Sequence, residues 1–223
     1  MSALIKSSIA RKWVMALSGL FLVVFLTQHF TINITSVIAP DTFNEWSHFM
    51  GYNPLVQFVL QPILLAGLIV HFVMGIVLEY QNNKARPIKY KRFDGNSNSP
   101  WVSRNMVITG LVVLAFLGLH MYDFWAHEIA YKFIYAEPES PTRYYAETVH
   151  KFEPVWRVVL YVISFVLLSL HLWHGFNSSF QSMGVKSVKK GDTLKKITYA
   201  WAVLIPAGFI FIALYHHFNP ITA

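Results

Sequence analysis

The sequence predicts an all-α membrane protein in which five transmembrane helices form one bundle, with residues 1–223 making a single domain. Two observations predict this fold class. Hydrophobic residues make up 55% of the chain and charged residues only 13%, whereas soluble domains average about 25% charged residues. The apolar residues are gathered into five stretches of roughly 20 residues, the length that a helix needs to cross about 30 Å of hydrocarbon.

Each of the five spans is an apolar run that only single polar residues interrupt. The first begins at a tryptophan after a basic tail, and it is too long for the apolar region of a signal peptide. The second and third are separated by a loop rich in Asn, Ser, Gly and Pro, and the third and fourth by a connection containing Pro138, Pro141 and Pro154. The expected spans are about 13–33, 55–78, 107–125, 155–176 and 197–217.

The positions of the basic residues predict the orientation of the chain. Most of the 18 Lys and Arg residues fall in the N-terminal tail, in the connection between spans two and three, and in the connection between spans four and five. These three segments lie on the same side of the membrane, opposite the connections that hold most of the acidic residues. The basic residues of the three segments are Lys6, Arg11 and Lys12; Lys84, Arg86, Lys89, Lys91, Arg92 and Arg104; and Lys186, Lys189, Lys190, Lys195 and Lys196. Cytoplasmic loops carry such an excess, so we expect a cytoplasmic N-terminus, an external C-terminus and a location in the cytoplasmic (inner) membrane. Topology and anionic lipid headgroups explain the net charge of +7, and no nucleic-acid partner is expected.

Four of the spans carry a histidine deep inside the apolar run, where an ionisable residue indicates function. At 1.5 Å per residue, His29 and His120 lie roughly 26 Å and 24 Å from the cytoplasmic ends of their helices. His71 and His171 lie roughly 12 Å and 9 Å from the same side. The four histidines therefore form an outer and an inner level about 14 Å apart, each with one imidazole from each of two helices.

This arrangement predicts two bis-histidine haems, with His29 and His120 as axial ligands of the outer iron and His71 and His171 as those of the inner iron. The chain has no cysteine, so the haems would be of b type, and iron–sulfur clusters and Cys-ligated zinc are excluded. Gly67 and Gly75 flank His71, and Gly175 follows His171, which would leave room for a flat macrocycle. His174 lies only about 60° from His171 on the same helix, and the spacing alone does not decide between them.

The remaining histidines are expected to be solvated or interfacial, because they fall in connections or at a span end. They are His48, His127, His150, His216 and His217. No H-E-x-x-H motif occurs, which disfavours zinc. The aromatic residues of segment 127–154 favour a short interfacial helix there, whereas segment 36–54 is expected to be a loop.

Three motifs resemble those of a known family. They are K-W-V-M-A-L-S-G-L-F-L at 12–22, H-F-T-I-N at 29–33 and H-L-W-H-G-F-N-S-S-F-Q-S-M-G at 171–184. The chain resembles the di-haem cytochrome b membrane anchor of succinate dehydrogenase and fumarate reductase, in its single-polypeptide b558 type. In that family the fourth-helix ligand precedes a glycine by four residues, so the resemblance selects His171 over His174.

The resemblance implies partners and a role in electron transfer. A flavoprotein subunit with the dicarboxylate site and an iron–sulfur subunit would dock on the cytoplasmic face, so this chain would carry no catalytic dicarboxylate site of its own. Electrons would pass between the iron–sulfur subunit and quinone, which we expect to be menaquinone, through the two haems. Glu45 and His48 are the candidate proton donors at an outer quinone site.

Two other functions are compatible with membrane histidines. One is the cytochrome b subunit of another quinone-linked dehydrogenase or of a hydrogenase. The other is a haem-free transporter or proton channel, which would show no b-type absorption band.

Overall fold

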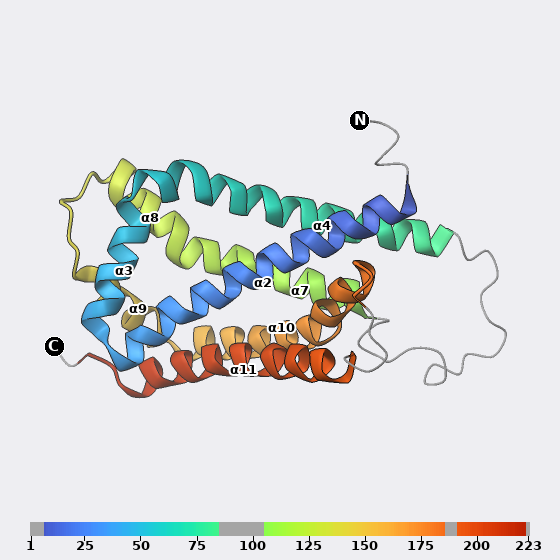
Figure 1. Cartoon of the computed structure of the whole chain (residues 1–223). Coiled ribbons are helices and arrows are strands. Elements are labelled where there is room, and N and C mark those ends of the chain that lie inside the picture. The colour runs from blue at the N-terminus through green and yellow to red at the C-terminus, as the bar shows by residue number, and fades with distance from the viewer. Residues whose placement is uncertain (1–6, 85–104, 186–190, 222–223) are drawn as a thin grey trace.

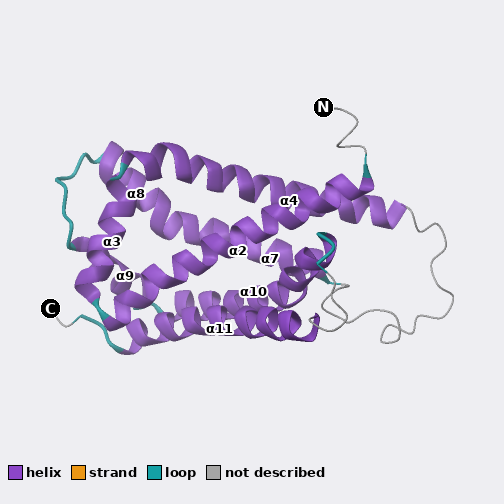
Figure 2. Cartoon of the chain, in the orientation of Figure 1, coloured by secondary structure: helices purple, strands orange, loops and turns teal. Residues whose placement is uncertain are grey.

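The computed structural model describes residues 7–84, 105–185 and 191–221, and every regular element in these ranges is helical (Figure 2). Five long helical stretches are long and apolar enough to cross a membrane, which confirms the all-α fold class. They are α2 (Ser8–Ile38); α4 (Gln61–Lys84), which a π-helical turn (Val56–Leu60) precedes; α7 (Met106–His120), which continues through π-helical turns and α8 (His127–Ile129) to Ile134; α10 (Val155–Ser182); and α11 (Gly191–Phe218).

The five long helices lie alongside one another, and two short helices gather at one end of the bundle (Figure 1). These are α3 (Pro40–Tyr52) and α9 (Arg143–Phe152), and we call this end the α9 end. The backbone N–H of Tyr145 donates to Asn44 Oδ1 at 2.8 Å, which ties α9 to α3. Helix α2 begins at the opposite end and runs toward the α9 end (Figure 1).

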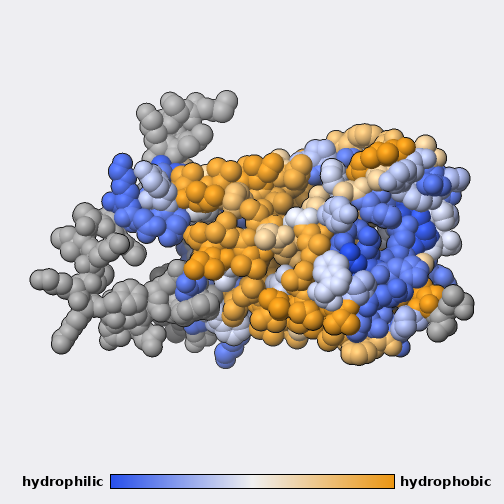
Figure 3. Space-filling model, turned by 180° about the vertical axis from the view of Figure 1, so that it is seen from behind, coloured by the Kyte–Doolittle hydropathy of each residue, from blue (hydrophilic) through white to orange (hydrophobic). Residues whose placement is uncertain are grey.

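On the face seen in Figure 3 an apolar band covers the middle of the bundle, and polar residues collect toward its ends. Large side chains such as Val24, Ile69 and Leu204 are more than half exposed although they lie in the middle of long helices. A water-soluble bundle would bury such residues, so this surface matches a hydrocarbon surrounding. The protein is therefore an integral membrane protein.

A buried apolar cluster lies where α2, α10 and α11 meet. Phe165, Phe209 and Ile212 are buried there, and Phe30 of α2 packs against them. Gly208 permits this approach, since a Cβ added to it would lie 2.3 Å from Cε2 of Phe30. Small residues commonly allow transmembrane backbones to approach closely.

We expect Gly208→Ala to destabilise the protein by about 1–3 kcal/mol, because the added methyl group overpacks this contact. Thermal unfolding in detergent measures the effect. Gly118→Ala is the matched control, since its added Cβ would meet nothing within 4 Å and Ala favours the helix by up to about 1 kcal/mol. Equal unfolding temperatures for the two variants would contradict this account of the packing.

The structure corrects three expectations from the sequence. Segment 36–54, expected to be a loop, is mostly helix α3, which begins at Pro40 because proline suits the first helical turn. The third span continues to Ile134, and the interfacial helix of segment 127–154 is α9 alone. All five helices extend beyond the expected spans, because hydropathy marks only their apolar parts. Segments 85–104 and 186–190, whose basic residues predict the orientation of the chain, lie outside the described residues.

Candidate functional site: two histidine pairs

The four intramembrane histidines come together in two pairs, each joining two helices. The imidazole centroids of His29 on α2 and His120 on α7 are 5.6 Å apart, with an angle of 87° between the rings. The centroids of His71 on α4 and His171 on α10 are 6.4 Å apart, with an angle of 72°. We call these the outer pair and the inner pair. Among the described residues no group of three or more His, Cys, Asp or Glu gathers as a metal-binding cluster.

The separations within the pairs suit a metal held between two imidazoles. A metal–imidazole bond of about 2 Å places the two ring centroids about 6 Å apart when the nitrogens bind from opposite sides. The observed 5.6 Å and 6.4 Å lie on either side of that value. Among the described residues each pair offers two imidazoles and no further ligand, which is a donor set that a haem iron accepts.

Hydroxyl groups contact the inner pair. Oγ of Ser18 lies 3.3 Å from Nδ1 of His71, and Oγ1 of Thr109 lies 3.3 Å from Nδ1 of His171. The glycine after each hydroxyl residue faces the same imidazole. A Cβ added to Gly19 would lie 3.3 Å from Cε1 of His71, and one added to Gly110 would lie 3.4 Å from Cε1 of His171.

The glycines expected to make room beside the inner pair have other neighbours. A Cβ added to Gly67 would lie 2.7 Å from the Phe21 ring, and one added to Gly175 would lie 2.9 Å from Met106 Cε. One added to Gly75 would meet only Met15 Cε, at 3.8 Å. Gly67 and Gly175 therefore make close helix contacts, whereas Gly19 and Gly110 on the neighbouring helices face the imidazoles.

Aromatic rings and an amide surround the outer pair. Phe25 stacks on His29 with a centroid separation of 5.5 Å, and Phe124 lies 5.2 Å from His120. Nδ2 of Asn33 lies 3.4 Å from Nδ1 of His29. Nδ1 of His120 is buried and has no hydrogen-bond partner in the part of the chain that the structure describes, so it lacks a hydroxyl contact like those of the inner pair.

A buried carboxylate lies one helical turn beyond His120. Asp123 is fully buried, and the Tyr161 hydroxyl donates to its Oδ2 at 2.9 Å. Nε of Arg157 lies 3.3 Å from the same oxygen, and the Tyr161 ring lies 6.3 Å from the His120 ring. The sequence analysis missed this group, although an acidic residue inside an apolar span was a readable signal.

His174 is placed differently from His171. Its side chain is half-buried, and it has neither a partner imidazole nor a hydroxyl contact like those of His171 among the described residues. The inner pair is therefore formed with His171.

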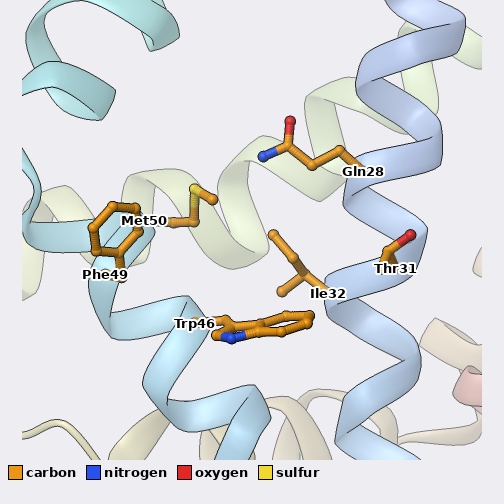
Figure 4. A pocket seen from close by; sticks show the side chains of 6 residues that line it. All are labelled: Gln28, Thr31, Ile32, Trp46, Phe49 and Met50. Carbon is orange, nitrogen blue, oxygen red and sulfur yellow. The ribbon is translucent and has the colours of Figure 1, made fainter.

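The candidate quinone residues Glu45 and His48 lie on α3. Glu45 is exposed, and Nε2 of His48 pairs with Glu139 Oε1 at 2.8 Å. A cavity of about 500 Å³ lies beside them, between α2 and α3. Its lining residues are Gln28, Thr31, Ile32, Trp46, Phe49 and Met50 (Figure 4). Neither Glu45 nor His48 lines it, and Gln28 directly precedes His29 of the outer pair.

The histidines outside the pairs are not all solvated. His127 and His150 have exposed side chains, as expected. His216, expected at an interface, is instead fully buried, and its Nε2 lies 2.8 Å from the Ser36 hydroxyl. The expectation was wrong because α9 covers this end of α11, where Phe152 stacks over the imidazole.

A cluster of charges joins α9 to the end of the third span. The Glu128 carboxylate lies 2.6 Å from Lys132 Nζ and accepts a hydrogen bond from Arg143. Burial by itself lowers the pKa of Arg143, but its hydrogen bonds to Glu147 and Glu128 raise this pKa above its ordinary value. Burial and the nearby Glu128 charge raise the pKa of the Tyr144 phenol, so Arg143 stays charged and Tyr144 stays neutral at neutral pH.

A helical bundle with a histidine pair at each of two levels defines the class of protein, an integral membrane protein with two candidate bis-imidazole sites. The chain is similar to the succinate dehydrogenase cytochrome b558 subunit of Bacillus subtilis (strain 168). The two are 27% identical over 101 residues, which cover 45% of this chain and 46% of that protein. The match therefore spans about half the length of the relative, and it supports the family resemblance of the motifs. No family model matches the chain, and no solved structure matches it.

Proposed function

We propose that this chain is the membrane-anchor cytochrome b subunit of a succinate:quinone oxidoreductase, relaying electrons between the iron–sulfur subunit and membrane quinone. The observation that carries the proposal is the pairing of four intramembrane histidines from four helices. The similarity to a cytochrome b558 subunit supports it independently. The flavoprotein and iron–sulfur subunits are proposed as partners on the cytoplasmic side, with the N-terminus on that side and the C-terminus outside.

The four histidines would hold two b haems, which supply one-electron transfer when bound. His29 and His120 would ligate the outer iron from α2 and α7, and His71 and His171 the inner iron from α4 and α10. The apolar and aromatic side chains around the pairs exclude water, which lowers the local dielectric and so influences the redox potential.

Haem stoichiometry tests the proposal. We expect the purified chain to show a b-type absorption band after reduction with dithionite, and pyridine extraction to give two haem b per chain. A colourless protein would overturn the proposal in favour of a haem-free transporter or channel, and one haem per chain would overturn the two-site arrangement.

The cavity between α2 and α3 is the proposed site of the quinone ring, which we expect to be menaquinone. It is lined mostly by apolar side chains, as quinone sites require, and the Gln28 amide can donate to a quinone carbonyl oxygen. Two of its lining residues, Gln28 and Ile32, lie within one helical turn of His29 along α2. Glu45 and His48 remain candidate proton donors near its rim.

We expect Trp46→Ala to raise the KM for quinone and to lower turnover, because it removes the largest wall of this cavity. Gln28→Leu is expected to lower turnover about tenfold, since it removes a hydrogen bond worth roughly 1.5 kcal/mol. Steady-state assays of the assembled complex with a soluble quinone measure both effects. Trp156→Ala is the matched control, because Trp156 is exposed elsewhere on the bundle.

The proton donors are tested with the same assay. Unchanged quinone turnover in both Glu45→Gln and His48→Ala would remove these two residues as candidates. Unchanged kinetics in both Trp46→Ala and Gln28→Leu would remove the cavity.

A further inference from the structure

Each histidine of the inner pair is contacted by a hydroxyl residue and the glycine that follows it, on a neighbouring helix. Ser18 and Gly19 lie on α2 beside His71 of α4, and Thr109 and Gly110 lie on α7 beside His171 of α10. In each case the hydroxyl oxygen is 3.3 Å from Nδ1 of the imidazole. In each case the glycine Cα faces the Cε1 edge of the same ring.

The hydroxyl contacts favour one ring nitrogen of each imidazole as the carrier of its hydrogen. A hydroxyl group has one hydrogen to donate. The Ser18 hydroxyl donates it to the Met15 carbonyl at 3.1 Å. The Thr109 hydroxyl donates it to the Met106 carbonyl at 2.9 Å, and a carbonyl oxygen can only accept. With the hydroxyl hydrogens on these carbonyls, each hydroxyl oxygen is an acceptor toward the imidazole, and this arrangement places the hydrogen of His71 and of His171 on Nδ1.

A neutral imidazole with its hydrogen on Nδ1 has its free lone pair on Nε2. Metal-ligating histidines commonly donate their second ring N–H to an oxygen, which fixes the tautomer and increases the basicity of the ligating nitrogen. Both hydroxyls are thus arranged as such partners. The two glycines let the imidazole edges lie against the backbone: an added Cβ at Gly19 would be tighter than ordinary contact, at 3.3 Å, and one at Gly110 would be at its limit, at 3.4 Å.

We propose that Ser18–Gly19 and Thr109–Gly110 are matched positioning elements that hold His71 and His171 in the Nδ1–H tautomer with Nε2 ready to ligate the inner haem iron. This inference rests on the proposed function, because it assigns these residues a role toward the haem. It also distinguishes the two sites. Among the described residues His120 of the outer pair has no such partner at Nδ1, so this ligand does not gain basicity in the way proposed for the inner pair.

The test uses the full chain with bound haem and measures each haem's midpoint potential and low-spin electron paramagnetic resonance signal. Ligands of greater basicity favour the oxidised iron, so Ser18→Ala and Thr109→Val are expected to raise the inner midpoint potential and to shift its resonance signal. A tenfold loss of preference for the oxidised form corresponds to about 59 mV for one electron. The outer potential is expected to stay unchanged.

Conservative variants separate positioning from packing. Ser18→Thr and Thr109→Ser keep the hydroxyl group, and we expect them to restore the wild-type potential and signal. Thr27→Val and Ser164→Ala are matched controls, because their hydroxyls donate to carbonyls of their own helices, Val23 and Leu160. Gly19→Ala and Gly110→Ala are expected to lower inner haem occupancy, whereas Gly118→Ala is not.

The outcomes distinguish this inference from the proposed function. Wild-type protein without haem would overturn both. Two haems whose inner potential and resonance signal are the same in wild type, Ser18→Ala and Thr109→Val would overturn the inference alone. Equal shifts of the inner potential in the Thr27→Val and Ser164→Ala controls would also overturn it, because the loss of any hydroxyl group in a span would then have the same effect.

Discussion

Replacing His29 by alanine is expected to reduce bound haem b from two to one per chain. A b haem without a cysteine linkage is held by axial ligation and packing, so loss of one imidazole of a pair removes most of its attachment. His120→Ala is expected to remove the same centre, because the two rings form one pair with centroids 5.6 Å apart. His71→Ala and His171→Ala are expected to remove the other centre.

Redox titration of the reduced b-type band identifies which centre each variant loses. His150→Ala is the matched control and is expected to keep both haems, since His150 is exposed at the α9 end. Loss of the same centre from His29→Ala and His71→Ala would overturn the pairing. Full haem retention in His171→Ala with loss in His174→Ala would reassign the fourth ligand.

The five helices could be predicted from the sequence because a membrane span is a matter of length and composition. The ends of the helices could not, because a helix continues past the hydrocarbon wherever its backbone stays hydrogen-bonded. Helix α3 was also not predicted. Its surface mixes polar and aromatic residues such as Asn44, Trp46 and His48, and it is stabilised by contacts with α9 that no local pattern reveals.

The histidines of the candidate site could be read from the sequence, but their surroundings could not. Depth along a helix follows from counting residues, and this placed His29 with His120 and His71 with His171. Contact between different helices depends on their rotation and crossing, which counting does not give. Ser18 and Thr109 are therefore ordinary span residues in the sequence, and only the packing of α2 on α4 and of α7 on α10 brings them to Nδ1 atoms.

Burial of His216 was missed for the same reason. It follows Tyr215 at the end of the fifth span, where a histidine normally reaches water. The short helix α9 folds back over this end and brings Tyr145 and Phe152 against the imidazole. Connections that fold back onto the bundle thus limit what span-by-span reading can predict.

Asp123→Ala is expected to destabilise the protein by about 3–5 kcal/mol, because removing one partner of a buried ion pair leaves the other uncompensated. Asp123 is fully buried, and the Arg157 side chain is only 15% exposed. The variant would also leave the Tyr161 hydroxyl without its acceptor. Thermal unfolding in detergent measures the loss. Asp41→Ala, in the exposed first turn of α3, is the matched control and is expected to change stability by no more than about 1 kcal/mol.

A double variant separates the charge from the packing in this group. Asp123→Ala combined with Arg157→Met removes both charges, so we expect it to be more stable than Asp123→Ala alone. Both variants remove the Asp123 carboxylate to which the Tyr161 hydroxyl donates. Because the Tyr161 ring packs near His120, both variants are expected to lower occupancy of the outer haem and to leave that of the inner haem unchanged. If the double variant is as unstable as the sum of its single variants, then Asp123 and Arg157 act independently and the ion pair contributes nothing to this end of the bundle.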